Sequence, residues 1–238
     1  CAAELNNPDI MTAINVEATA NLARLAARRE VECFIHLSSA GVVGPSKAPW
    51  IDEDTPCKPL TAYEISKWQA EQALARTPAE DMRLYILRPV NVVDDHRNGI
   101  LSMALRNSFI DRFMLFLKGR EAAHLVHAAD VAAAALHLAS APSSPEGIYF
   151  AGCDEDLRNT VAGLYRLCRN ATGSRPGSIP PSLPTHVPYW LRRIARGRCL
   201  HGKSRFSSAR LVATGFQPPL GIEGLIARVC TAVEDTER

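Results

Sequence analysis

Tyr63 and Lys67 are the residues of this chain best suited to acid–base chemistry. They are four positions apart in a segment that we expect to be helical, so both project from one helix face, one turn apart. A lysine ammonium favours the phenolate, and we expect it to lower the pKa of Tyr63 from about 10. Such a tyrosine can take a proton from an alcohol or give one to a carbonyl oxygen. The alternative is a chance pair on a solvated helix.

Ser39 lies 24 residues before Tyr63 and follows an apolar run, residues 31–37, that we predict to be a buried strand. Ligands of open parallel sheets bind at the carboxyl ends of strands, so this hydroxyl is placed to hydrogen-bond the oxygen that Tyr63 would protonate. Read alone, Ser38-Ser39 is a strand-to-loop exit. Serine, tyrosine and lysine in this order, on a strand end and the following helix, favour a catalytic set.

The segments that must position these residues alternate between helix and strand. We predict helices over residues 7–29 and 62–76, and strands over 31–37 and 82–87, the second stopped by Pro89. Further on we predict helices at 102–117, from about 130, and at 159–171, 188–195 and 223–233, strands at 125–127 and 147–151, and loops at 44–59 and 173–188. This alternation is typical of a doubly wound α/β sheet with parallel strands.

Composition excludes several classes of protein. The chain has 238 residues, 47% of them apolar and 22% charged, with a net charge of +2, so nothing indicates a nucleic-acid partner. Seven cysteines without a Cys-x-x-Cys pair favour reduced thiols in the cytoplasm over disulfides or a metal site. No apolar run reaches the roughly 18–20 residues of a membrane-spanning helix. Because it begins at Cys1, without Met or a secretory signal, we interpret the chain as a piece whose beginning is missing.

Several short motifs occur in the order and spacing of a known family. They are residues 15–19 (for Asn-x-x-Gly-Thr), 39–44 (the end of Ser-Ser-x-x-Val-Tyr-Gly), 63–67 (Tyr-x-x-x-Lys), 88–92 (Arg-x-x-Asn-Val), 126–131 (Val-His-Val-x-Asp-Val) and 214–218 (Leu-Gly-Phe-x-Pro). Through them the chain resembles the extended short-chain dehydrogenase/reductases, in the NAD-dependent epimerase/dehydratase branch that acts on nucleotide sugars.

The resemblance implies a Rossmann-type doubly wound parallel sheet, its N-terminal βαβ part absent, with a smaller C-terminal α/β substrate domain. Residues 1–93 would be the C-terminal portion of the NAD(P)-binding domain. Residues 94–238 would be mainly the substrate-binding domain, with 125–150 returning to the Rossmann domain. Residues 1–3 resemble the end of the family's fourth strand.

By the same resemblance, Tyr63 is the catalytic acid or base, Lys67 lowers its pKa and holds the nicotinamide ribose, and Ser39 orients the substrate oxygen. The remaining expected contacts with the cofactor, NAD or NADP, are Ala2, Asn15, Ser38, Pro89 and Val90; those with the substrate are Ala40, Gly41, Asn91 and Arg205. The alternative for Asn15 is an amide bonded to neighbouring backbone. Arg205 ends a basic amphipathic stretch from Arg192 that could receive a substrate diphosphate, rest on an anionic membrane or be a solvated face.

The chain departs from the family pattern in its phosphate-binding part. The glycine-rich turn that lets a pyrophosphate approach a helix N-terminus is absent. We expect the absent piece that contains it to be about two βα units, or roughly 60–75 residues. Four positions differ from the family pattern: Ala18, Val43, Asp94 and Ala123. These differences weaken the assignment of a nucleotide-sugar substrate more than the assignment of redox chemistry. We therefore expect this chain to bind NADH no more tightly than about 100 μM, and residues 31–37 to lack strand partners and promote self-association.

The function that this sequence favours is NAD(P)-dependent oxidation or reduction of a sugar hydroxyl or ketone, on a nucleotide sugar in polysaccharide biosynthesis. The enzyme would be an epimerase, dehydratase or oxidoreductase of the cytoplasm. A homodimer is one assembly that it could form. A ketone reductase or hydroxysteroid-dehydrogenase-like enzyme of the same superfamily is the alternative. A non-catalytic dinucleotide-binding scaffold or sensor is a third, which the intact set of Ser39, Tyr63 and Lys67 argues against.

Overall fold

The computed structural model describes residues 4, 7–77, 82–95, 99–141, 144–173, 181–197 and 202–236. Its central sheet has the order β1-β3-β6, formed by β1 (Cys33–Leu37), β3 (Arg83–Pro89) and β6 (Gly147–Ala151). All three strands run parallel, with Phe34 opposite Leu84 and Leu87 opposite Tyr149. The predicted alternation of helices with parallel strands is confirmed.

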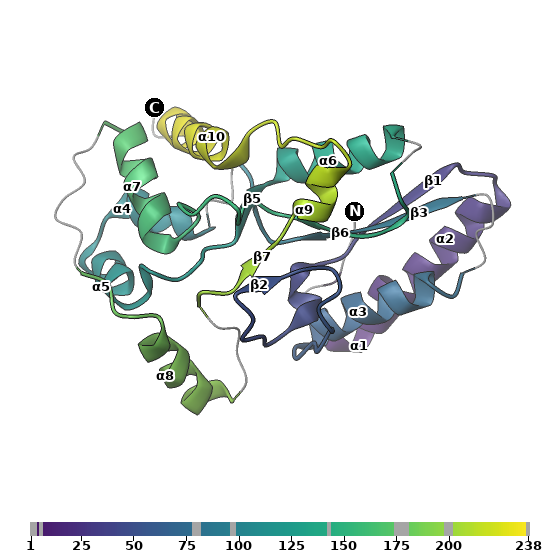
Figure 1. Cartoon of the computed structure of the whole chain (residues 1–238), viewed down its shortest axis with the longest axis horizontal. Helices are drawn as coiled ribbons and strands as arrows, with labels where there is room; N and C mark the ends of the chain where they lie inside the picture. Colours follow the sequence, from purple (N-terminus) through teal and green to yellow (C-terminus); the bar gives the residue numbers. More distant parts are fainter. Residues whose placement is uncertain are drawn as a thin grey trace.

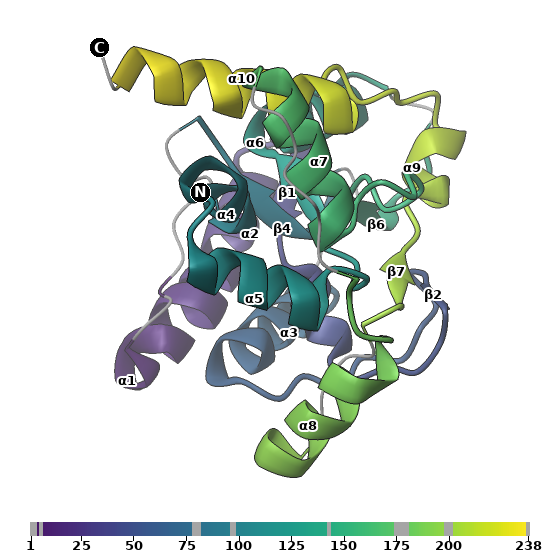
Figure 2. The same cartoon turned by 90° about the vertical axis from the view of Figure 1, so that its left-hand side faces the viewer.

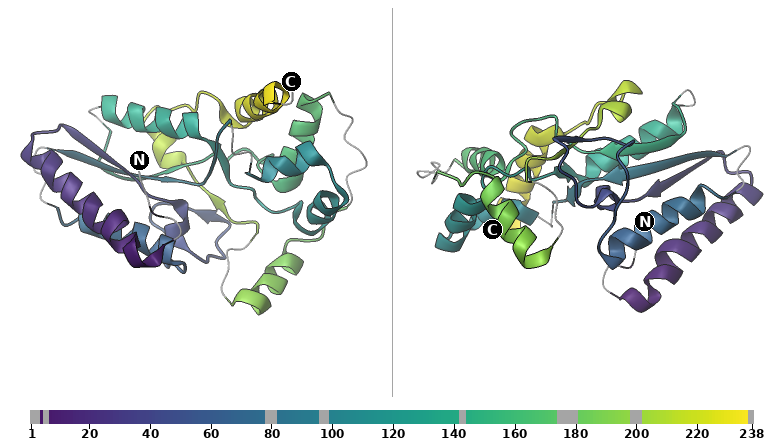
Figure 3. Two further views of the ribbon diagram at one scale, coloured as in Figure 1. Left: turned by 180° about the vertical axis from the view of Figure 1, so that it is seen from behind. Right: turned by 60° about the horizontal axis from the view of Figure 1, so that its bottom comes forward.

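Helices cover both faces of this sheet (Figures 1 and 3). One face carries α1 (Pro8–Met11), a π-helical segment (Thr12–Glu17), α2 (Ala18–Arg28) and α3 (Ala62–Leu74), and the other carries α6 (Ala128–Ser140). Tyr85, Leu87 and Phe150 are fully buried within these layers. Apolar side chains on both faces explain why the parallel strands appear in the sequence as nearly continuous apolar runs.

Further elements complete the molecule. They are β2 (Trp50–Ile51), β4 (Asn91–Val93), α4 (Ser102–Arg106), α5 (Phe109–Lys118), β5 (Leu125–His127), α7 (Val161–Ala171), α8 (His186–Arg196), β7 (Arg205–Phe206), α9 (Ala209–Ala213) and α10 (Gly221–Thr236), with 3-10 turns at Ala40–Val43 and Gly99–Leu101. β4 pairs with β5, and β2 pairs with β7, both in parallel. These two small sheets connect the first half of the chain to the second.

The prediction of one helix over residues 102–117 is wrong, because the chain turns at Asn107. This residue has a left-handed backbone, with φ of 48°, and ends α4. Ser108 then starts α5, where its hydroxyl accepts from the Asp111 backbone N–H and the Asp111 carboxylate accepts from the Ser108 N–H. A left-handed cap followed at once by a capping box ends one helix and begins the next.

The expectation that residues 31–37 lack strand partners is wrong for one edge. β1 begins at Cys33 and pairs with β3 along its whole length. Within the described part of the chain, no strand pairs with its other edge. β3 also runs further than predicted and includes Pro89 as its last residue, so the missing N–H falls at the end of the ladder.

Candidate functional site

Helix α3 brings Lys67 to the carboxyl end of β1. The helix begins at a capping box, in which Thr61 accepts from the Glu64 N–H and Glu64 accepts from the Thr61 N–H. One turn after Tyr63, the buried Lys67 ammonium donates to the carbonyl of Leu37, the last residue of β1, at 2.8 Å. The helix thus positions Tyr63 and Lys67 at the sheet edge where ligands bind in such folds.

The electrostatics of this pair differ from expectation. Burial raises the pKa of Tyr63 above its ordinary value. Burial also lowers the pKa of Lys67, an effect that the Glu71 carboxylate opposes. The expected lowering of the tyrosine pKa is therefore wrong for this arrangement, because desolvation dominates and the ammonium is bonded to a backbone carbonyl. At neutral pH Tyr63 is a protonated phenol, the form that can give a proton to a carbonyl oxygen.

The two serines after β1 have different partners. Ser39 accepts a hydrogen bond from the Gly41 N–H at 3.1 Å and caps the 3-10 turn at Ala40–Val43. Its own hydroxyl hydrogen has no acceptor among the described residues, so Ser39 can donate to a ligand. The Ser38 hydroxyl donates to the Glu71 carboxylate, and its contact with a cofactor stays a prediction.

Glu71 is the centre of a buried network that the sequence analysis missed. Arg88, on β3, donates to it through two nitrogens, at 2.6 and 3.0 Å, and both side chains are almost fully buried. With the bond from Ser38, this ion pair joins α3 to the ends of β1 and β3. The network therefore fixes the position of the helix that carries Tyr63 and Lys67. Two features of the sequence could have indicated this network. They are a glutamate four residues after Lys67 and an arginine within an apolar strand.

Asn15 lies in the π-helical segment and is buried. Its amide exchanges hydrogen bonds with the backbone of Glu4, at 2.8 and 2.9 Å, and donates to the Ser66 hydroxyl at 2.9 Å. These contacts are those of the alternative role, an amide bonded within the fold, and they tie the first helices to α3. Ala2, the other N-terminal candidate, lies outside the described residues.

A cavity of about 310 Å³ lies along β1 next to these residues. Residues 34–38 line it together with Tyr63, Lys67 and Pro89. His36 is buried, and its Nε2 has no hydrogen-bond partner in the described structure. Burial, and secondarily the Lys67 charge, lower the pKa of His36 to about 4, so its imidazole is neutral at physiological pH. Polar groups with spare hydrogen-bonding capacity make this cavity the candidate site.

The residues expected to contact the substrate do not gather around this cavity. Asn91 follows β3 closely, and its amide donates to the Ala123 carbonyl at 3.0 Å. Ala40 is buried and Gly41 lies against Glu64. The Arg205 guanidinium donates to three backbone carbonyls, at 2.6 to 3.3 Å, in residues 154–157. Arg205 therefore has a structural role here, and its contact with a substrate diphosphate stays a prediction.

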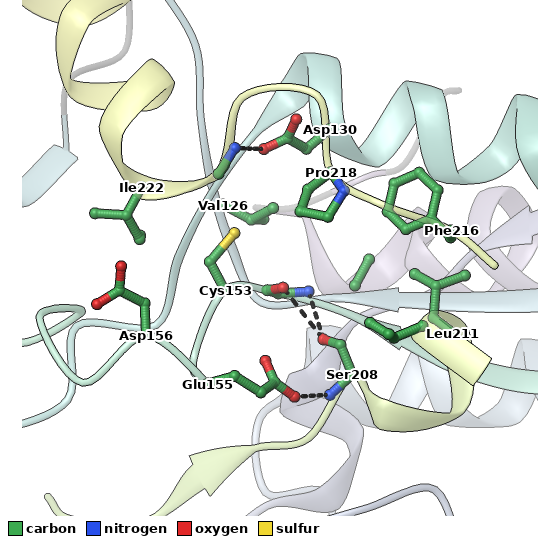
Figure 4. Close-up of a pocket in the computed structure, with 14 residues that line it drawn as sticks. Val126, Asp130, Cys153, Glu155, Asp156, Ser208, Leu211, Phe216, Pro218 and Ile222 are labelled. Atoms are coloured by element: carbon green, nitrogen blue, oxygen red, sulfur yellow. Dashed lines mark hydrogen bonds between the residues drawn. The ribbon is translucent and has the colours of Figure 1, made fainter. Parts of the chain in front are cut away.

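A second cavity, of about 290 Å³, lies between the end of β6 and the segments around α9 and α10 (Figure 4). Its polar groups serve the fold: Asp130 accepts from the backbone N–H groups of Leu220 and Gly221 at the start of α10. Burial and the surrounding carboxylates raise the pKa of Cys153 to about 12, so this thiol stays protonated and unreactive. Nothing in this cavity resembles the acid–base set beside β1.

No described segment contains a group of three His, Cys, Asp or Glu residues that could hold a metal ion. Among the described helices, none combines the length and apolar character needed to span a bilayer.

Solved structures share this fold at low sequence identity. Bordetella bronchiseptica WbmG in complex with NAD is 18% identical, with a TM-score of 0.71, over 99% of this chain and 70% of that one. The UDP-glucose 4-epimerase of Thermotoga maritima with UDP-glucose is also 18% identical, with a TM-score of 0.70, over 100% of this chain and 77% of that one. The predicted Rossmann-type α/β fold is confirmed, and the three-stranded central sheet is a part of such a core.

Curated relatives match part of the chain. It is 31% identical over 106 residues, 43% of this chain and 31% of the relative, to N-acetyl-alpha-D-glucosaminyl-diphospho-ditrans,octacis-undecaprenol 4-epimerase of Escherichia coli O157:H7. It is 29% identical over 145 residues, 56% of this chain and 46% of the relative, to a putative UDP-glucose 4-epimerase of Methanocaldococcus jannaschii. The chain thus spans a third to a half of their lengths. The sequence model of the NAD dependent epimerase/dehydratase family matches residues 1–152, and the chain belongs to this family.

Proposed function

We propose that this chain carries the acid–base side of an NAD(P)-dependent enzyme that oxidises or reduces a sugar hydroxyl or ketone on a nucleotide sugar. The observation that carries the proposal is the buried Lys67, one turn from Tyr63, beside a cavity that follows β1 to its carboxyl end. Relatives of the same fold support it, because WbmG was solved with NAD, RMD of Pseudomonas aeruginosa with NADPH, and the Thermotoga maritima enzyme with UDP-glucose.

The residues present fit the nicotinamide–ribose end of such a cofactor. A lysine has three N–H donors, and Lys67 has one described acceptor, so it can serve ribose hydroxyl oxygens as well. Tyr63, Pro89 and Val90 would form the rest of this contact. When bound, the nicotinamide supplies the hydride acceptor and donor of the reaction.

The chain's own residues would manage the proton. Tyr63 would give its phenolic proton to the ketone oxygen, or take one from the hydroxyl in the opposite direction. Ser39 would donate a hydrogen bond to the same oxygen and orient it. Lys67 would stabilise the phenolate that forms when Tyr63 loses its proton. The network of Glu71 and Arg88 would hold α3 in the position that this chemistry requires.

The Tyr63→Phe variant of the natural full-length protein tests this assignment. We expect the turnover rate to fall by roughly 10²–10⁴, the usual contribution of a general acid–base group, with little change in cofactor affinity. Tyr165→Phe is the matched control, because the Tyr165 hydroxyl is bonded to Asn107 at 2.7 Å and Tyr165 does not line the cavity, so removing this hydroxyl should leave turnover unchanged. A Tyr63→Phe rate within about tenfold of the parent would contradict the role of Tyr63.

Lys67→Ala separates a catalytic lysine from a merely buried one. We expect it to weaken cofactor binding and also to move the apparent pKa of the catalytic base further upward, because one ammonium would serve the ribose and offset part of the effect of burial on the phenolate. Cofactor titration and a pH–rate profile measure the two effects. A normal cofactor affinity together with an unshifted profile would remove Lys67 from the site.

The fate of the cofactor distinguishes the reactions that this site could support. An epimerase returns the hydride to its substrate and keeps its cofactor, whereas a ketone reductase of the same superfamily must release it. Counting the nicotinamide bound to purified full-length protein therefore separates these two. A second substrate class is a sugar joined through diphosphate to a polyprenol, as in the name of the Escherichia coli relative. Assays with both substrate classes distinguish them.

A further inference from the structure

The charges of this chain are distributed unevenly. Residues 157–222 contain eleven of its 27 Lys and Arg residues and none of its 25 Asp and Glu residues. The rest of the chain is therefore acidic overall, although the whole chain has a net charge of only +2. Helix α8 lies within residues 157–222. Three of the cations in this segment, Arg158, Arg192 and Arg210, are paired with carboxylates, whereas Arg193 on α8 forms no ion pair among the described residues.

Helix α8 exposes its apolar side. Trp190, Leu191 and Ile194 share one face at helical spacing, and they are 54%, 58% and 81% exposed. The opposite side is turned toward the protein, where Tyr189 is buried and Arg192 forms an ion pair with Glu121 at 2.6 Å. A surface helix ordinarily buries its apolar stripe, so this orientation leaves an apolar face without a partner in the described structure.

The neighbouring helix adds to the apolar surface. Figures 1 and 2 show α8 at the bottom end of the molecule, with α5 above it. The segment before α8 is held to α5 by hydrogen bonds from Leu183 N–H to the Phe116 carbonyl, at 2.8 Å, and from the Ser182 hydroxyl to the Leu115 carbonyl, at 3.0 Å. In α5, Phe109 and its neighbours are exposed as well; the fractions for Phe109, Ile110 and Phe113 are 86%, 72% and 53%.

We propose that the exposed faces of α8 and α5 form a docking surface for a bilayer that contains anionic lipids. The Arg193 guanidinium lies 5.4 Å from the centre of the Trp190 ring, which places a cation beside the apolar face. Tryptophan beside an arginine matches the boundary between acyl chains and headgroups. With eleven residues, α8 is far too short to span a bilayer and would lie in the plane of its surface. This inference does not depend on the proposed catalytic function.

Sedimentation of the chain with vesicles tests the proposal. The vesicles would be made of phosphatidylcholine alone, or of phosphatidylcholine with 30% phosphatidylglycerol. We expect binding to increase about tenfold with the anionic lipid and to weaken in high salt. The combined substitution of Trp190, Leu191 and Ile194 by Ser should reduce binding about tenfold, and Arg193→Glu should reduce the dependence on anionic lipid. Leu136→Ser is the matched control, because Leu136 is 71% exposed on α6 and should not affect binding.

Three results would overturn the proposal. The first is equal vesicle binding by the parent and the triple serine variant, with circular dichroism showing both folded. The second is binding that does not respond to the anionic lipid. The third is a parent dimer in light scattering that the triple variant abolishes, since the apolar face would then bind a second copy of the chain. Arg193→Glu keeps the apolar residues, so it still tests the charge dependence if the triple variant fails to fold.

Discussion

Helices α3 and α8 depart from the usual amphipathic pattern in opposite ways. Helix α3 turns two charged residues, Lys67 and Glu71, toward the sheet and buries them. Helix α8 turns Trp190 and Ile194 away from the protein and exposes them. In a typical surface helix the apolar stripe faces the core and the charges face water. The two helices therefore show where this chain deviates from what folding alone favours.

The two deviations differ in how they are compensated. The Glu71 carboxylate has Arg88 and Ser38 as partners, and the Lys67 ammonium has a backbone carbonyl, so both charges are stabilised inside the fold. Apolar residues of similar size are often at least as stable as a buried ion pair, so stability alone does not explain α3. The apolar face of α8 has no such compensation within the described structure. We infer that α3 is shaped by chemistry inside the molecule and α8 by a partner outside it.

The largest expected effect comes from breaking the ion pair of α3. Glu71→Leu leaves the Arg88 guanidinium buried without its carboxylate, and we expect the free energy of unfolding to fall by about 3–5 kcal/mol. The double variant Glu71→Leu with Arg88→Met should recover most of this loss, because both charges are then removed. Urea unfolding measures both. A single-variant loss below about 1 kcal/mol would show that the network contributes little to holding α3.

Local signals made much of the fold predictable. The capping residue Thr61, Pro8 at the first position of α1, and the apolar runs of β1 and β6 each act through neighbours in sequence. The pairing of β2 with β7 was not predictable, because each has two residues and Trp50 finds its partner at Arg205. Such short strands form only because residues far apart in the sequence pair with each other, and the periodicity of a single sequence does not reveal such pairs.

In the candidate site, too, local features were predictable and contacts between distant residues were not. Spacing alone placed Tyr63 and Lys67 on one face, and the structure has both beside the cavity. The direction of the tyrosine pKa shift was not predictable, because it depends on burial, which spacing does not give. The amide of Asn15 and the guanidinium of Arg205 are taken up by backbone groups distant in sequence, at Glu4 and at residues 154–157.

A smaller effect is expected from His36, which faces Lys67. Its pKa falls to about 4 in the folded protein, from an ordinary value of about 6.5. Between these values the unfolded chain takes up a proton that folded His36 does not, so stability falls as the pH drops from about 6.5 to 4. From pH 7 to pH 5 we expect a loss of about 2 kcal/mol. Urea unfolding at both pH values should show a correspondingly smaller loss in His36→Leu; an equal loss would mean that other groups cause it.

The smallest expected effect on the free energy of unfolding concerns the exposed face of α8, compared with the buried face of α3. Ile194→Ser should change the free energy of unfolding by no more than about 0.5 kcal/mol, because this side chain is 81% exposed and already largely in water. Leu74→Ala, on the buried face of α3, should cost about 2–5 kcal/mol by leaving a cavity. Denaturant unfolding without lipid compares them directly. A loss above about 2 kcal/mol from Ile194→Ser would mean that the outer face of α8 is packed in solution, and α8 would then be an ordinary amphipathic helix whose apolar side already has a protein partner.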